Sequence, residues 1–380
     1  MAIRKSVTEL TPEEKIKFIT GVKRLKTTPP PPPTPPIADL TATNMYDWFV
    51  EVHDRSMTFL TPPDDPTGRN AAHQGPAFLP WHREFILRFE RQLQIAVGDD
   101  NFGLPYWDWA ADAALPDPTD PNQAVIWRND FMGGQGTPVR TGHFREGEWT
   151  LFPSGSLARE LGRSEGVSTL PTQAHANAAV AATTYDSSPW NRLSATGFRN
   201  QFEGWLPANG LHNRIHLWVG GSMLPGTSPN DPVFFLHHCN VDRIWALWQQ
   251  CHPGVPYRPT DADADAPAGH RLNDRMFPWT SPSDRRIADL LDFTALGYTY
   301  DSFHRRFIRL RRTTGDRFIS SQIIEVSDHC DTRDDIATRV FIPAAAGGSI
   351  RARYERTRPG ASPGDVTTIE TATDVLTVES

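Results

Sequence analysis

The chain has 380 residues, of which 38% are hydrophobic and 22% are charged, values that are typical of a soluble globular protein. No run approaches the roughly twenty apolar residues of a membrane span, which excludes a transmembrane protein. The formal net charge is −7, and Lys and Arg are interspersed with Asp and Glu, so nucleic acid is not expected as a partner.

The N-terminus and the cysteines indicate a cytoplasmic protein. The first eight residues include Arg4 and Lys5 but no apolar segment and no small-residue cleavage site, which argues against an ordinary secretory signal. Three cysteines without CxxC spacing predict reduced thiols and neither a disulfide framework nor a zinc ribbon: Cys239, Cys251 and Cys330. Export bound to a carrier protein agrees with both observations, so it stays open.

The first predicted element is a helix. Thr11 has the character of an N-cap, Pro12 and two acids follow it, and apolar residues continue at helical spacing through Val22. The proline-rich run 29–36 then predicts an extended, stiff surface connection, with a ligand for an SH3-type domain as the alternative.

Two further helices are predicted on either side of a loop. Residues 45–53 have apolar positions at a period near 3.6, which places His53 on a helix. The segment 61–75 is rich in Pro and Gly and predicts a loop. Residues 80–93 open with a proline and carry a broad apolar stripe, so His82 is expected in the first turn of a helix.

The rest of the chain predicts more helices and then a C-terminal part with β-like runs. Residues 101–204 indicate long loops with short helices, and helices are predicted at 209–219 and 232–250. The fold class is therefore mainly α, with at least four core helices. After Tyr300 short β-like runs predict a β-rich extension: 307–310, 319–326, 340–342 and 350–354. We expect a domain boundary near residue 302.

His212 and His216 have the spacing of a metal-chelating pair. Four residues apart on a helix, two imidazoles project from the same face. Random placement of thirteen histidines in this length would give about 0.4 such pairs, so the spacing alone does not separate ligation from an ordinary surface pair.

His237 and His238 lie within the strongly apolar helix predicted at 232–250. A buried imidazole requires a hydrogen-bond partner or a metal, because an unsatisfied polar ring costs on the order of 1 to 3 kcal/mol. Adjacent helical residues point about 100° apart, so we expect at most one of the two rings to face a shared site. The alternative is a core histidine bonded to the backbone or to Asp242.

The first half of the chain supplies a second set of histidines, His53, His73 and His82. Each one alone is more often structural. Together the two sets form all-imidazole groups among tryptophan and phenylalanine, and such ligation suits copper, zinc, nickel or iron and disfavours magnesium and calcium.

Two long motifs resemble those of a known family. Residues 73–90, HQGPAFLPWHREFILRFE, resemble the first copper signature of tyrosinases and polyphenol oxidases, and residues 231–242, DPVFFLHHCNVD, resemble the second. They occur in the family's order, with His212-x-x-x-His216 between them. The resemblance covers residues 1–301 and ends at Tyr298-Thr299-Tyr300, which is similar to the motif that closes the family's catalytic domain.

The resemblance implies a cofactor, a ligand set and a reaction. Two copper ions would lie in a helical bundle and use dioxygen to oxidise catechol-like substrates to o-quinones, and some members also hydroxylate monophenols or act on o-aminophenols. The implied ligands of the first copper are His53, His73 and His82, and those of the second are His212, His216 and His238. His237 would lie beside the site as a non-ligand.

Other positions bear on catalysis through the same resemblance. Glu203 and Asn213 look like the pair that positions a water to deprotonate a phenol, with a solvated surface acid as the alternative for Glu203. Leu217 is similar to the position that shapes substrate access. Ala71 stands where plant and fungal members have a thioether-forming cysteine, so that link is not expected. Cys239 is expected to be an inert buried thiol.

Three functions remain to be separated at this point. The oxidase of residues 1–301 leads, and residues 302–380 are either a lid over the site or a stabilising extension. A haemocyanin-like oxygen carrier uses the same copper pair, and a di-zinc hydrolase would require carboxylates at ligand spacing, which neither motif supplies. The expected partners are a phenolic substrate and dioxygen, with a copper-delivery or carrier protein as a further candidate.

Overall fold

The computed structural model describes residues 1–163, 166–207 and 210–303, and the backbone of four strands in the C-terminal part of the chain. It divides into two compact units, Met1–Thr299 and Tyr300–Ser380. This division lies near the boundary expected at residue 302, while the roles assigned to the two parts stay predictions.

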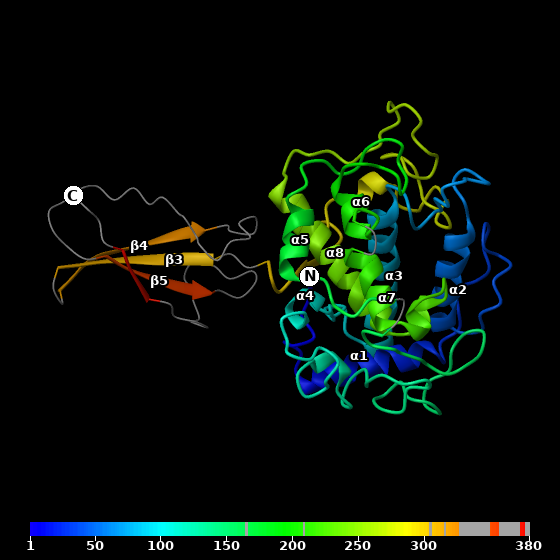
Figure 1. Ribbon diagram of the computed structural model, residues 1–380, viewed down its shortest axis with the longest axis horizontal. Coiled ribbons are helices and arrows are strands. Elements are labelled where there is room, and N and C mark those ends of the chain that lie inside the picture. Colours follow the sequence, from blue (N-terminus) through cyan, green and yellow to red (C-terminus); the bar gives the residue numbers. More distant parts are fainter. Residues whose placement is uncertain are drawn as a thin grey trace. The chain divides into compact units, whose positions relative to one another are not determined.

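The first unit is mainly helical, as predicted, and Figure 1 shows its helices packed around α3 and α8. Its α-helices are α1 (Pro12–Leu25), α2 (Met45–Thr58), α3 (Phe78–Val97), α4 (Trp109–Asp112), α5 (Gln173–Val180), α6 (Phe198–Glu203), α7 (Leu211–Val219) and α8 (Val233–Cys251). Short 3-10 helices are η1 (Val125–Trp127), η2 (Gly221–Met223), η3 (Ser228–Asn230) and η4 (Ile287–Leu290). The short strands β1 (Ala2–Arg4) and β2 (Tyr298–Tyr300) pair with each other.

Local sequence explains where α1 begins and how it lies. The Thr11 side chain accepts a hydrogen bond from the Glu14 backbone N–H, and the Glu14 side chain accepts one from Thr11 in return, which forms a capping box. Phe18 and Val22 are buried as expected from the apolar spacing, but Ile16 is 59% exposed. The apolar stripe predicted for α1 is therefore wider than the face of the helix that packs against the core, because it includes Ile16.

Aromatic packing joins α2, α3 and α8 in the core. The rings of Phe89 in α3 and Phe235 in α8 stack in parallel, and Phe49 of α2 meets both edge-on. Because these side chains are completely or almost completely buried, they hold the three helices in fixed positions. The histidines that follow Phe235 in α8 are thereby directed toward α3 and α7.

A buried ion-pair network lies next to the histidines of α3 and α8. Arg83 directly follows His82, and Asp242 lies one helical turn after His238. Asp242 of α8 accepts hydrogen bonds from Arg83 of α3, from Arg4 of β1 and from the Tyr298 hydroxyl of β2. Arg4 also pairs with Glu90 of α3 at 2.9 Å. Four segments that are distant in sequence are thus tied together, and removing one partner would leave an uncompensated buried charge.

The second unit contains a four-stranded antiparallel sheet in the order β4-β3-β5-β6. Its strands are β3 (Arg306–Thr314), β4 (Arg317–Val326), β5 (Ile350–Arg356) and β6 (Thr373–Leu376). The β-like runs predicted at 307–310, 319–326 and 350–354 lie within β3, β4 and β5, which confirms a β-rich C-terminal part. The run predicted at 340–342 lies outside the described residues.

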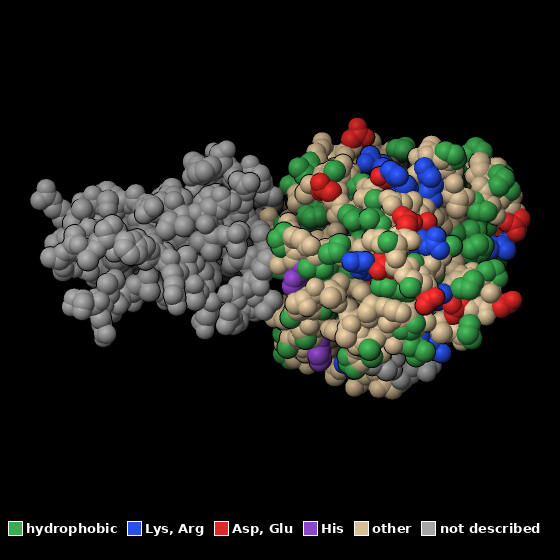
Figure 2. Space-filling model, turned by 90° about the horizontal axis from the view of Figure 1, so that it is seen from above, with side chains coloured by type: hydrophobic (Ala, Val, Ile, Leu, Met, Phe, Trp, Pro, Cys, Tyr) green, Lys and Arg blue, Asp and Glu red, His purple; other side chains and the backbone are tan. Residues whose placement is uncertain are grey.

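The described surface carries charges of both signs. In Figure 2 lysines and arginines alternate with acidic side chains on the face shown, without a continuous basic area. Among the described helices, none is both long and apolar enough to cross a membrane.

Candidate metal centre

Seven histidines of the first unit gather in two groups that have the composition of metal sites. In each group the candidate ligand atoms lie within 4.8 Å of one another. One group comes from α2, the following loop and α3, and consists of His53, His73 and His82. The other comes from α7 and α8, and consists of His212, His216, His237 and His238.

The two groups touch each other. The ring of His82 stacks on that of His238 with centroids 4.2 Å apart and planes inclined by 15°. The ring of His73 lies 5.8 Å from that of His212. The sequence-predicted ligands, drawn from segments up to 185 positions apart, therefore form one continuous centre.

The expectation that only one ring of the adjacent pair in α8 faces the site is wrong. His237 stacks on His212 at 5.2 Å, and His238 stacks on His82 and also lies 5.0 Å from His212, so both rings contact the centre. Because the centre lies between α7 and α3, a divergence of about 100° brings both rings to it. Neither ring nitrogen of His237 has a hydrogen-bond partner among the described residues.

Three of the rings are oriented by backbone carbonyls. In each, Nδ1 donates a hydrogen bond to a carbonyl oxygen at 2.6 to 2.8 Å. These pairs are His53 with Gly226, His82 with Phe78, and His216 with Met223. A carbonyl only accepts, so each Nδ1 carries the proton and each Nε2 keeps its lone pair. The Nε2 atoms of His53 and His82 are buried without a partner, as metal-binding atoms would be.

Burial keeps all seven rings neutral. It lowers the pKa of His53 to about 3 and that of His216 to about 4. Burial, together with the proximity of the other rings, also lowers the pKa well below the usual value for the remaining five, which are His73, His82, His212, His237 and His238. Neutral imidazole is the form that binds metals.

The distances and the donor set fit a transition metal such as copper. The Nε2 atoms of His216 and His238 are 3.4 Å apart. Two ligands bound at about 2.05 Å in tetrahedral geometry would lie about 3.3 Å apart. Within the part of the chain that is described, neither group includes a carboxylate, which disfavours magnesium and calcium.

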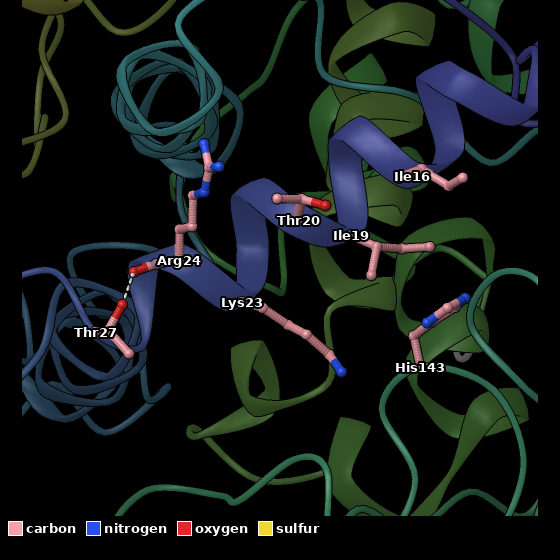
Figure 3. Close-up of a pocket in the computed structure, with 7 residues that line it drawn as sticks. All are labelled: Ile16, Ile19, Thr20, Lys23, Arg24, Thr27 and His143. Carbon is pink, nitrogen blue, oxygen red and sulfur yellow. Dashed lines mark hydrogen bonds between the residues drawn. The ribbon is translucent and has the colours of Figure 1, made fainter.

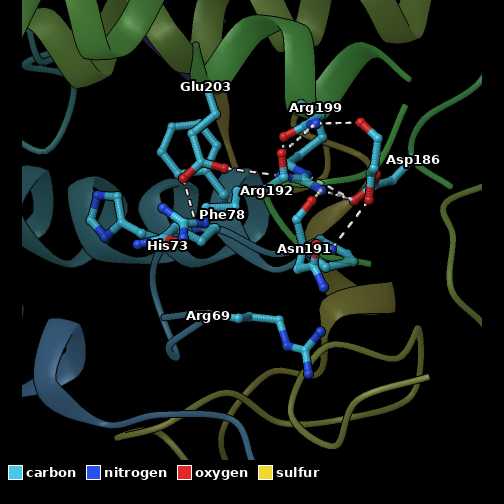
Figure 4. A network of polar contacts seen from close by, with 12 residues as sticks. Arg69, His73, Phe78, Asp186, Asn191, Arg192, Arg199 and Glu203 are labelled. Atoms are coloured by element: carbon cyan, nitrogen blue, oxygen red, sulfur yellow. Dashed lines mark hydrogen bonds and ion pairs between the residues drawn. The ribbon is translucent and has the colours of Figure 1, made fainter. Parts of the chain in front are cut away.

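Glu203 is completely buried beside the histidines, so the alternative of a solvated surface acid is wrong. Figure 4 shows its carboxylate between the loop of His73 and Arg199. Oε1 accepts the backbone N–H of Gln74 at 2.6 Å, and Oε2 pairs with Arg199 at 3.2 Å. Burial raises the pKa of Glu203, and the charge of Arg199 opposes that shift.

Arg199 serves a second buried acid. It pairs with Asp186 at 2.7 Å, and burial raises the pKa of Asp186 to about 6. One guanidinium therefore stands between two carboxylates (Figure 4). Because the guanidinium is always charged, it fixes the position of Glu203 as well as compensating its charge.

Asn213 and Glu203 both contact His212. The Nδ1 atom of His212 lies 3.0 Å from the Asn213 side-chain oxygen and 3.4 Å from the Glu203 carbonyl. Because both neighbours of Nδ1 are acceptors, Nδ1 carries the proton and Nε2 of His212 keeps the lone pair that can bind a metal. This Nε2 is buried without a hydrogen-bond partner. Leu217 follows His216 and is half-buried.

Several residues of the centre could not be found from the sequence. Gly226, Phe78 and Met223 act through backbone carbonyls, which every residue type possesses. Arg199 is one of many arginines, and only its burial beside Glu203 distinguishes it. No pattern in the chain marks these contacts, because they join segments that are far apart in sequence.

Two other features do not belong to the centre. A surface pocket of about 380 Å³ lies along α1, and Figure 3 shows the residues that line it, which are Ile16, Ile19, Thr20, Lys23, Arg24, Thr27 and His143. None of them is one of the seven histidines. Cys239 is buried with its Sγ 3.2 Å from the Leu104 carbonyl, Cys251 lies at the end of α8, and Cys330 lies outside the described residues.

Taken together, the fold and the site define a helical protein with a buried, all-histidine centre built from two adjoining groups. Comparison with known proteins identifies this class. Residues 43–251 match the family model described as the common central domain of tyrosinase. The chain is 42% identical over 310 residues to a tyrosinase of Streptomyces glaucescens, an alignment that covers 80% of this chain and all of that protein.

Further relatives agree. A grixazone synthase of Streptomyces griseus is 37% identical over 338 residues, with 79% of this chain and 99% of that protein covered. A polyphenol oxidase structure from Thermothelomyces thermophila has the same fold, with a TM-score of 0.56, 23% identity and coverage of 79% of this chain and 88% of that chain. The chain therefore belongs to the tyrosinase family of type-3 copper phenol oxidases, which confirms the resemblance seen in its motifs.

Proposed function

We propose that the chain holds two copper ions and oxidises o-diphenols with dioxygen. His53, His73 and His82 hold the first ion, and His212, His216 and His238 hold the second. The observation that carries the proposal is the contact between two all-histidine groups of neutral rings, in which the Nε2 atoms of His53, His82 and His212 are buried without a hydrogen-bond partner. Haemocyanin-like oxygen binding and zinc hydrolysis are disfavoured by the tyrosinase relatives and by the absence of carboxylates from the two described groups.

The choice of His238 over His237 as the sixth ligand rests on position. His238 lies between the two groups, stacked on His82 and 3.4 Å from His216 through the Nε2 atoms. His237 is stacked on His212 and lies 5.2 Å from His216, both in the second group. We assign the sixth ligand to His238 because its ring contacts His82 of the first group as well as His212 of the second.

The protein residues would perform three tasks around the metal pair. The copper ions supply the two-electron reduction of dioxygen, and the phenolic substrate supplies the electrons. The carbonyl-bound rings keep their Nε2 atoms in place, and burial excludes water and competing ligands. Glu203 and Asn213, which both adjoin His212, would position a water molecule that takes the proton of a monophenol.

Metal analysis tests the copper assignment. Protein loaded with copper is expected to bind two ions per chain and to oxidise a catechol. His238→Ala is expected to bind one ion and to lose activity, whereas His237→Phe is expected to bind two. One ion or none in the unaltered protein would contradict the proposal, and loss of copper from His237→Phe alone would exchange the roles of the two histidines.

Substrate comparison tests the role of Glu203. Glu203→Gln is expected to lower initial rates on tyrosine far more than rates on a catechol or an o-aminophenol. Both carboxylate oxygens accept hydrogen bonds here, and an amide offers only one acceptor, so copper content must be measured in parallel. Equal losses on both substrates at full copper content would remove the water-positioning role.

The remaining assignments concern the C-terminal unit, location and partners. We propose that residues 302–380 act as a cover of the catalytic unit, so rates on a catechol should rise when limited proteolysis removes them. Unchanged rates would favour a stabilising extension. A cytoplasmic location and a copper-delivering carrier stay predictions, which cell fractionation and copurification would test.

A further inference from the structure

The loop that carries His73 is the least directly held part of the centre. It joins α2 to α3, and the buried Nδ1 atom of His73 has no hydrogen-bond partner among the described residues. By contrast, His53 and His82 lie on helices and donate from Nδ1 to carbonyls. The position of the His73 ring therefore depends on how the backbone of its own loop is held.

A histidine outside the centre, His270, contacts this loop near both of its ends. It is completely buried, its Nε2 lies 2.8 Å from Thr61 Oγ1, and the Ala77 backbone N–H donates to its Nδ1 at 3.1 Å. A backbone N–H only donates, so Nδ1 is the acceptor and Nε2 carries the proton that is given to Thr61. One neutral ring thus bridges two residues that are sixteen positions apart.

The middle of the loop packs against the same ring. A Cβ added to Gly75 would lie 2.7 Å from Cε1 of His270 and 2.7 Å from Cδ of Arg69, so only glycine fits between them. The backbone at Gly75 therefore packs directly against the imidazole of His270. The ring supports the loop by contact as well as by hydrogen bonds.

His270 is itself fixed by the core. The Tyr257 hydroxyl donates to the His270 carbonyl at 2.9 Å, and the ring of Tyr257 packs against that of Tyr185 at 4.5 Å. The Tyr185 hydroxyl donates in turn to the Pro76 carbonyl at 2.7 Å. Both tyrosines are buried, so the support of the loop is continuous with the rigid interior.

We propose that His270 is a positioning residue of the first half-site, which acts through the loop 61–77 to hold His73 where it binds metal. The inference rests on the proposed function, because it takes His73 as a ligand. It assigns a task to a buried histidine that neither binds metal nor touches substrate. Its loss should affect one half-site and leave the other intact.

Three variants separate this role from general stability. His270→Leu removes both hydrogen bonds at similar volume. His270→Asn keeps an amide oxygen near the place of Nδ1, where it can still accept from Ala77. His252→Leu is the control, because the His252 ring also bonds a distant backbone group, the Val180 carbonyl at 2.8 Å, but lies beyond the end of α8.

Copper retention against a chelator is the first readout. The unaltered protein is expected to lose its two ions together, whereas His270→Leu should lose one of them on the order of tenfold more readily and keep the other. His270→Asn should recover most of the loss, and His252→Leu should match the unaltered protein. Equal retention in all four proteins, or an equal loss of both ions in His270→Leu, would overturn the proposal.

Amide hydrogen exchange of the metal-free protein is the second readout. His270→Leu should exchange faster in peptides that cover 61–77 and at the normal rate in peptides of α8. Unchanged exchange in 61–77 would overturn the proposal. If His270→Leu does not fold, His270→Ala is compared in the same way, because it also removes the hydrogen bonds to Thr61 and Ala77. Because no copper is present, this result is separate from the proposed function, which is tested by the copper content and catechol oxidation of the unaltered protein.

Discussion

Acidification is expected to unfold the metal-free protein at a pH that most globular proteins tolerate. The seven histidines of the centre are neutral in the folded state, with the pKa of His53 lowered to about 3 and that of His216 to about 4. In the unfolded chain each ring titrates near its ordinary pKa of about 6.5. Between these values the folded protein binds fewer protons than the unfolded chain, so its stability falls as the pH falls below about 6.5.

The expected loss is large. Lowering the pH from about 7.5 to about 5.5 costs up to about 1.4 kcal/mol for each ring that stays neutral, or about 9 kcal/mol for the seven together. Asp112 and Asp186 act in the opposite direction, because burial raises the pKa of each to about 6, but they return only about 1 kcal/mol each. A net loss of this size approaches the whole stability of about 5 to 15 kcal/mol found in typical domains.

Denaturant titration of the metal-free protein at several pH values measures this loss. The midpoint is expected to be highest above about pH 6.5 and to fall steeply toward pH 5.5. His237→Phe removes one of these neutral rings, so its loss of stability between about pH 7.5 and about pH 5.5 should be smaller by up to about 1.4 kcal/mol. A midpoint that stays constant over this range would refute the account of seven buried neutral imidazoles.

Other substitutions test the supports of the fold. Arg159→Met would leave Asp231, at the start of α8, buried without its partner, and denaturant titration should show a loss of about 3 to 5 kcal/mol. Gly103→Ala would place a Cβ 2.2 Å from a carbonyl oxygen of β1 and should cost about 1 to 3 kcal/mol in the same assay, while Gly134→Ala, with its nearest contact at 3.7 Å, should stay within about 0.5 kcal/mol. Thr11→Ala removes the cap of α1 and should lower the thermal midpoint by the equivalent of about 1 kcal/mol, and an unchanged midpoint would mean that the capping box does not stabilise the helix.

The helical frame of the centre was predictable because its sequence signals are local. The apolar spacing around His53, the proline that precedes His82 by two residues and the four-residue spacing of His212 and His216 each specify a helix and a direction. Helical periodicity depends on neighbours within one or two turns, so it can be read without knowing the fold.

The error at His237 and His238 shows where such reasoning stops. The angle between adjacent helical residues was correct, but the expectation assumed a site on one side of α8. In the structure, His238 contacts both His82 of α3 and His212 of α7, and His237 also contacts His212. Which side chains face a site depends on how many helices surround it, and that is a property of packing.

The sequence by itself determined the class of chemistry, because the motifs at 73–90 and 231–242 resemble those of tyrosinases and its two sets of histidines suit a transition metal. Tertiary structure alone decided which ring nitrogen carries the proton in His53 and His216, through the carbonyls of Gly226 and Met223. It also decided the burial of Glu203 and the contact of His270 with the loop of His73. The physical reason is that every residue has a backbone carbonyl and every residue except proline has a backbone N–H. Which of them meets a given side chain depends only on where distant parts of the chain come together.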